Sequence, residues 1–115
     1  MIQWSEDIAI YLHREAVDFR KAINGLSVLV EAMGWSVYQR ALFVFCNKKR
    51  TQLKVLYWDE SGYALWQKRL EEARFYWPRS HSDDMVILSH EQWHWLLRGL
   101  DISRLRPHSA LKYGD

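Results

Sequence analysis

The sequence predicts an α+β domain in which an antiparallel sheet of about four or five strands packs against two helices. Residues 41–78 contain short apolar segments of period two that are separated by turn residues, which is typical of neighbouring strands. Residues 18–34 and 89–99 have helical periodicity instead. At 115 residues, the chain has the size of one domain. We expect residues 1–101 to form this domain and residues 102–115 to form a loosely ordered tail.

The first expected elements are a strand and a helix. Apolar residues alternate over residues 7–13, which predicts a short strand. Over residues 18–34 they recur three and four positions apart, which predicts a helix with Asp18 as its N-cap. Gly34 is suited to the position just after the helix. Gly25 disfavours the helix interior, so it indicates close packing against a neighbouring element.

The middle of the chain begins with the strand that we expect at the centre of the sheet. Residues 42–46 are continuously apolar, which is typical of a strand covered on both faces. Residues 47–51 are expected to form a basic hairpin tip. Residues 52–58 then alternate, so that Lys54 and Trp58 lie on the face opposite to the flanking apolar residues.

A second hairpin is expected to follow. Residues 59–62 have the composition of a hairpin loop, in which Gly62 would adopt positive φ. Residues 63–70 return as a strand, with Trp66 and Lys68 on one face. Residues 74–77 are predicted to form a last short strand, which the proline at position 78 ends.

The C-terminal part is expected to contain an edge strand and a second helix. Residues 79–84 read as a polar linker, and residues 85–88 as a short edge strand. Ser89, with Gln92 three residues later, fits a capping box at the start of a helix. Gly99 is expected to end this helix.

Composition limits the classes of function. The formal net charge is only +2, but residues 40–80 contain nine basic and four acidic side chains. Such an uneven distribution favours contact with phosphates. The single cysteine, Cys46, has no partner for an internal disulfide, which indicates a buried thiol. There is no basic, apolar leader at the N-terminus and no apolar run of about 20 residues, so we expect a cytoplasmic protein without a membrane anchor.

One motif resembles a catalytic zinc site. His90, Glu91 and His94 match the H-E-x-x-H pattern on an expected helix. If Ser89 caps this helix, however, His90 lies at its exposed start. A third ligand would have to come from the C-terminal tail, where His108 is the only histidine. We therefore interpret the motif as a chance match, and we expect no catalytic residue, metal or cofactor.

Basic residues and tryptophans are interleaved in the middle of the chain. Cations that hold phosphates and rings that stack on bases together make a nucleic-acid-binding surface. The candidate residues are Arg20, Lys21, Lys48, Lys49, Arg50, Lys54, Lys68, Arg69, Arg74, Trp58 and Trp66. Alternatively, these cations are solvated charges or cover a core that contains the tryptophans. The register of the strands decides which of these residues share a face.

Several segments resemble a known family. Residues 18–26 read DFRKAINGL, which is similar to the DMRKGxxGL signature of the TnpB, or Orf2-type, proteins of bacterial insertion sequence family sixty-six. The same family's later blocks are matched by LFVF at 42–45, LKVL at 53–56 and the segment 68–78. The resemblance covers about residues 8–101. The chain departs from the family pattern where Ala22, Thr51 and Ala73 replace glycine.

The resemblance implies a non-catalytic role in transposition, beside a separate transposase of the DDE type. It implies three possible partners, which are DNA at the ends of the element, the transposase and a sister accessory protein. We expect DNA contact through the basic and aromatic sheet surface. The alternative is a protein-interaction module that docks on the transposase or the sister protein without binding DNA. The oligomeric state stays open.

Overall fold

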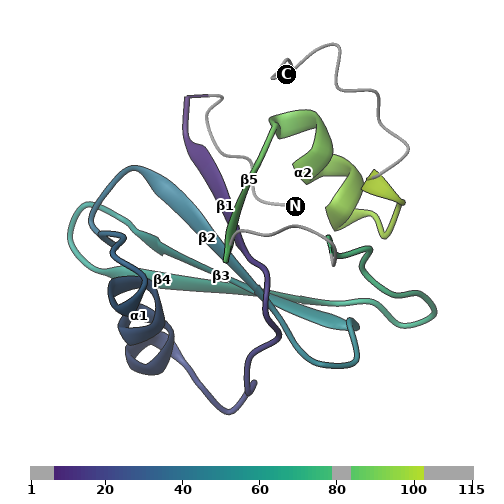
Figure 1. Ribbon diagram of the computed structural model, residues 1–115, viewed down its shortest axis with the longest axis horizontal. Helices are drawn as coiled ribbons and strands as arrows, with labels where there is room; N and C mark the ends of the chain where they lie inside the picture. The colour runs from purple at the N-terminus through teal and green to yellow at the C-terminus, as the bar shows by residue number, and fades with distance from the viewer. Residues whose placement is uncertain (1–6, 79–83, 103–115) are drawn as a thin grey trace.

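A five-stranded sheet forms the centre of the molecule, which we describe from a computed structural model over residues 7–78 and 84–102 (Figure 1). The strands have the spatial order β4-β3-β2-β1-β5. They are β1 (Ala9–His13), β2 (Ala41–Cys46), β3 (Gln52–Trp58), β4 (Tyr63–Arg69) and β5 (Met85–Leu88). Two helices, α1 (Ile23–Ala32) and α2 (His90–Leu97), complete the α+β fold, as predicted.

The sheet is mixed, so the prediction of a purely antiparallel sheet is wrong. β1 pairs with β2 in parallel, whereas the other three pairs are antiparallel. Parallel neighbours need a long crossover, and residues 14–40, which include α1, provide it. β1 and β2 therefore end at the same end of the sheet as the hairpin tip at residues 47–51. We call this the tip end, and the opposite end, with the β3–β4 loop, the far end.

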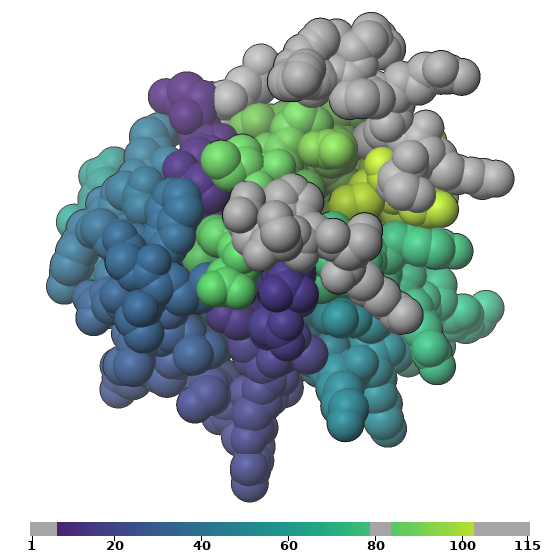
Figure 2. Space-filling view, in the orientation of Figure 1, coloured from purple at the N-terminus to yellow at the C-terminus, as the bar shows by residue number. Residues whose placement is uncertain are grey.

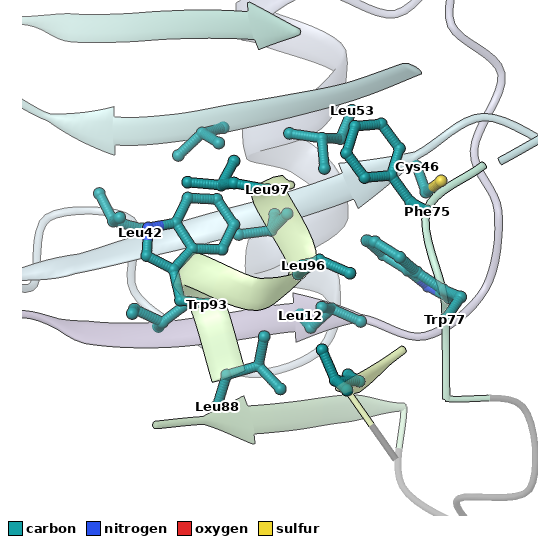
Figure 3. Close-up of a cluster of buried hydrophobic side chains, with 14 of the residues drawn as sticks. Leu12, Leu42, Cys46, Leu53, Phe75, Trp77, Leu88, Trp93, Leu96 and Leu97 are labelled. Atoms are coloured by element: carbon teal, nitrogen blue, oxygen red, sulfur yellow. The ribbon is translucent and has the colours of Figure 1, made fainter. Parts of the chain in front are cut away.

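Each helix covers a different face of the sheet (Figure 1). Side chains alternate along β2, and all six of its residues are buried, as expected for a central strand. On one face α2 contributes Trp93, Leu96 and Leu97 to a core that we call the α2 core (Figure 3). On the other face α1 contributes Leu26 and Val30 to the α1 core.

Helix α1 starts later than its sequence pattern predicts. The helix begins at Ile23, and its N-cap residue Ala22 makes no side-chain capping bond. Asp18 instead accepts a hydrogen bond from the backbone N–H of Arg20, 3.0 Å away, in a turn before the helix. Gly25 therefore lies in the first helical turn, where an added Cβ would approach the Lys21 side chain to 3.1 Å.

Two predictions about the strands and loops after β3 are also wrong. In the β3–β4 loop the residue with positive φ is Glu60, at 57°, rather than Gly62. Residues 74–77 form no strand of the described sheet, although the Phe75 N–H donates to the Arg50 carbonyl over 2.7 Å. Their alternation has another cause: Phe75 and Trp77 are buried in the α2 core (Figure 3), whereas Tyr76 is exposed.

The predicted start of α2 and the predicted glycines after both helices are confirmed. Ser89 and Gln92 form both hydrogen bonds of a capping box at the start of α2. After α1 and α2, Gly34 and Gly99 have φ of 84° and 75° and close Schellman-type turns. Strand β5 lies at one edge of the sheet, as expected.

Some predictions fall on residues that lie outside the described part of the chain. These are the polar linker, apart from Asp84, and the tail from residue 103 onward. Ile102, which we assigned to the tail, is buried in the α2 core. Neither of the two described helices has the length and apolar character that crossing a bilayer requires.

Candidate nucleic-acid interface

The hairpin tip is held in shape by Asn47. Its Oδ1 accepts hydrogen bonds from the backbone N–H groups of Thr51 and Gln52, at 2.9 and 3.0 Å. Its Nδ2 donates to the Thr51 hydroxyl over 3.1 Å. These bonds add to the backbone hydrogen bonds of the turn, from the Asn47 N–H to the Gln52 carbonyl and from the Arg50 N–H to the Asn47 carbonyl. Lys48 and Lys49, both exposed, lie at the end of the hairpin.

Arg50 has an unusual position at the base of this tip. Its backbone is left-handed, with φ of 62°, and its guanidinium carbon lies 5.6 Å from the centroid of the Trp77 ring. The indole Nε1 of Trp77 donates to the carbonyls of His13 and Arg14, at 3.2 and 3.0 Å, so the ring beneath Arg50 is fixed. One guanidinium nitrogen of Arg50, Nη1, is enclosed and has no hydrogen-bond partner among the described residues.

A groove of about 540 Å³ lies beside the tip. We call it the tip groove. It is lined by Arg50, Ala73, Arg74, Phe75, Tyr76, Trp77 and Gly99. In Figure 2 the hairpin tip and the segment that follows Arg69 project at the lower right, and the bond from Phe75 to Arg50 joins them. The groove thus combines two guanidinium groups with aromatic rings.

Four cations gather at this end of the molecule, and we call Lys48, Lys49, Arg50 and Arg74 the basic tip. No member forms an ion pair with a carboxylate of the described residues, whereas Arg14, Arg20, Arg40 and Arg69 all do. Two acidic residues, Glu71 and Glu72, lie close to Arg74 in the sequence. Of these, Glu71 pairs with Arg69 over 2.9 Å. The basic tip therefore keeps charge available for an external anion.

Lys54 does not share this surface, because its charge is used inside the protein. The side chain is buried in the α1 face, and its Nζ donates to the carbonyls of Phe19 and Lys21 over 2.8 and 2.7 Å. The ammonium also lies 4.6 Å from the centroid of the Phe19 ring. Burial lowers the pKa of Lys54. This lysine holds the turn at residues 18–22 against the sheet.

Lys68 and Trp66 lie on the opposite face from Lys54, under α2. The Lys68 Nζ donates to the Leu97 carbonyl over 2.7 Å and so binds the last turn of the helix, where a cation is favoured. Trp66 packs against the α2 core. Lys54 and Lys68 are therefore engaged on opposite faces of the β3–β4 hairpin, by the turn before α1 and by α2, and they do not share one basic and aromatic face.

Trp58 lies at the far end of β3, away from the basic tip. Its ring centroid is 4.9 Å from that of Tyr38 and 5.1 Å from that of Tyr63, in edge-to-face geometry. We call these three residues the aromatic cluster. Tyr38 is 59% exposed. Its side chain raises the pKa of Tyr63 to about 12.

The remaining candidates lie near the tip end but are engaged differently. The Arg20 guanidinium contacts the Asp18 carboxylate at 2.6 Å, and this bond lowers the pKa of Asp18 to about 2. Arg69 pairs with Glu71. Lys21 is exposed next to the first turn of α1. Of the eleven predicted residues, the structure brings together Lys48, Lys49, Arg50 and Arg74.

The H-E-x-x-H motif lies at the start of α2, and its two histidines differ in environment. His90 Nε2 donates to the Ile8 carbonyl over 2.8 Å, so this nitrogen is occupied by the protein. His94 is exposed. Within residues 7–78 and 84–102, no three metal-binding side chains come close enough to hold an ion.

Tyr76 and Trp77 belong to the groove, yet neither was among the predicted site residues. The sequence pattern assigned them to a strand, in which they would have been ordinary sheet residues. The signal in the sequence was the segment 74–77, in which one basic residue is followed by three aromatic residues. Only the fold shows that this segment returns to the hairpin tip.

The fold and the site define a small α+β domain with a cationic hairpin tip. The chain belongs to the family of IS66 Orf2-like proteins, whose model matches residues 8–107. This is a family of accessory proteins of insertion sequences, which suggests a role in transposition.

Two relatives come from Sinorhizobium fredii (strain NBRC 101917 / NGR234). The uncharacterized protein y4jC is 36% identical over 107 residues, which cover 92% of this chain and 91% of the relative. The uncharacterized protein y4hO is 29% identical over 102 residues, which cover 88% of each chain. No solved structure matches the chain.

Proposed function

We propose that this protein is a non-catalytic accessory protein for transposition that contacts DNA through the basic tip. The observation that carries the proposal is the grouping of Lys48, Lys49, Arg50 and Arg74 without carboxylate partners among the described residues. Membership of the IS66 Orf2-like family suggests a role in transposition, and transposition acts on DNA. Such a protein would act in the cytoplasm, where the bacterial DNA is.

The chemistry of the basic tip suits phosphate contact. Lys48 and Lys49 are exposed point charges on a rigid turn, and arginine presents several donors to phosphate oxygens. Each contact releases a counterion from DNA, so affinity should fall steeply with salt. Contacts of this kind give affinity and orientation, while base contacts give sequence selectivity.

The test is a titration of element-end duplex DNA across a range of salt concentrations. We expect the slope of log K against log salt to become shallower by about 0.9 for each lysine replaced by glutamine, in Lys48→Gln and Lys49→Gln. Arg40→Gln is the matched control, because it removes one positive charge at the far end. An unchanged slope in both lysine variants, or an equal change in Arg40→Gln, would contradict the proposal.

The aromatic cluster supports a second candidate function, docking on the transposase or the sister accessory protein. Tyr38 is exposed and packs against Trp58 and Tyr63, and tyrosine and tryptophan are enriched in protein interfaces. The basic tip and the aromatic cluster lie at opposite ends, so both contacts are compatible. Loss of transposase capture in a Tyr38→Ala pull-down, with capture retained in Tyr76→Ala, would support this function. Equal capture of the transposase by both variants would exclude the aromatic cluster as the docking surface.

A further inference from the structure

We propose that the tip groove binds one unpaired nucleotide of single-stranded DNA, with its phosphate on Arg50 and Arg74 and its base on Tyr76. This inference rests on the proposed function and specifies the form of DNA that the tip end prefers. The tip groove, at about 540 Å³, lies within the size range of sites for small ligands.

The Arg50 guanidinium suits a phosphate ligand. It is held over the Trp77 ring, and its Nη1 is enclosed without an acceptor among the described residues. The enclosed Nη1 cannot reach a phosphate, but the Arg50 side chain also lines the groove. A phosphate there would lie against the positive charge of the guanidinium. Arg74 lines the same groove and adds a second cation.

The groove is already formed in the free protein. The Phe75 N–H donates to the Arg50 carbonyl over 2.7 Å, and the Trp77 indole donates to the carbonyls of His13 and Arg14 at the end of β1. Gly99 forms part of the wall, where an added Cβ would lie 3.2 Å from the Leu70 side chain. Pre-formed walls reduce the ordering that binding requires.

The exposed Tyr76 side chain favours an unpaired nucleotide over a duplex. Tyr76 lines the groove and is 50% exposed, so part of its side chain is accessible in the same groove as Arg50 and Arg74. Stacking on an aromatic side chain needs the face of a base, which is covered by neighbouring bases in a duplex. Phosphates alone would need only the cations. A half-exposed aromatic side chain in the same groove as two cations therefore favours a strand whose bases are unstacked.

The experiment compares a labelled oligothymidylate of about 12 nucleotides with a duplex of the same length, by fluorescence anisotropy at one salt concentration. We expect Tyr76→Ala to weaken single-strand binding by about 5- to 150-fold and to leave duplex binding unchanged. Tyr38→Ala is the matched control, since it removes an equally exposed tyrosine at the far end and should change neither. Because Tyr76 points to solvent, its replacement should leave the fold intact.

The outcomes separate this inference from the proposed function. If Tyr76→Ala has no effect on the oligothymidylate, or weakens both forms of DNA equally, the groove does not bind an unpaired base. In that case, duplex binding that still depends on Lys48 and Lys49 would leave the proposed function standing. If neither form binds to the unaltered protein at low salt, the proposed function fails, and this inference fails with it.

Discussion

The lysines of this molecule lie in two different environments and have different roles. Lys54 is buried and binds two backbone carbonyls, whereas Lys48 and Lys49 are exposed at the hairpin tip. Sequence periodicity correctly grouped Lys54 with Trp58 along β3 and Trp66 with Lys68 along β4, but it left open which of these residues share a face of the sheet. It could not show that a helix covers each face, because that depends on tertiary packing. The predicted nucleic-acid-binding surface was therefore too large, since it included the buried Lys54.

The structural role of Lys54 leads to a stability prediction. In Lys54→Met the carbonyls of Phe19 and Lys21 lose a charged donor, while the apolar stem stays in place. We expect the free energy of unfolding to fall by about 1–3 kcal/mol. Lys49→Met, at an exposed site, is the control and should change it by less than about 0.5 kcal/mol. Equal effects in denaturant titrations would show that the two bonds do not stabilise the turn.

Cys46 provides a prediction about pH. Burial raises the pKa of its thiol to about 11, although the neighbouring Arg50 guanidinium acts in the opposite direction. Because the thiolate is the reactive form, labelling by a thiol reagent at pH 8 should be far slower in the native protein than in denaturant. The folded pKa lies above the ordinary value of 9.0, so ionisation of Cys46 should lower stability between about pH 9 and 11. Equal labelling rates in native and denatured protein would contradict this burial.

At the scale of elements, local capping patterns were predictable and the start of α1 was not. The capping box of Ser89 and Gln92 and the two terminal glycines were identified because each depends on neighbouring residues only. Asp18 has the chemistry of an N-cap, but Lys54, 36 positions later in the chain, binds the carbonyls of the turn that follows it. This contact between residues distant in sequence overrides the local preference for a helix that starts at Asp18.

The hairpin tip depends on one side chain, Asn47. In Asn47→Ala the N–H groups of Thr51 and Gln52 lose their acceptor, so we expect a loss of about 1–3 kcal/mol in the free energy of unfolding. DNA affinity should fall as well, because Lys48 and Lys49 would no longer be held in one arrangement. Asn24→Ala, at an exposed site in α1, is the comparison. A variant with unchanged stability and affinity would show that these bonds do not fix the tip.

At the scale of the whole molecule, the parallel pairing of β1 with β2 determines where the site lies. The crossover through α1 brings the ends of β1 and β2 together, so the carbonyls of His13 and Arg14 reach Trp77 beneath Arg50. The sequence favoured antiparallel hairpins throughout, because the alternation of apolar residues along a strand does not show whether its neighbouring strands are parallel or antiparallel. The tip groove joins three parts of the chain that are distant in sequence, and it could only be recognised in the fold. The aromatic cluster occupies the far end, so the molecule has two separate candidate surfaces.

The central claim is that the basic tip contacts DNA, and the salt dependence of binding tests it most directly. Affinity for element-end duplex DNA would be measured over a series of salt concentrations for the unaltered protein, for the double variant Lys48→Gln with Lys49→Gln, and for Arg40→Gln. Our account predicts a slope of log K against log salt that is shallower by about 1.8 in the double variant and unchanged in Arg40→Gln. Identical slopes in all three proteins, or no binding by the unaltered protein at low salt, would contradict it.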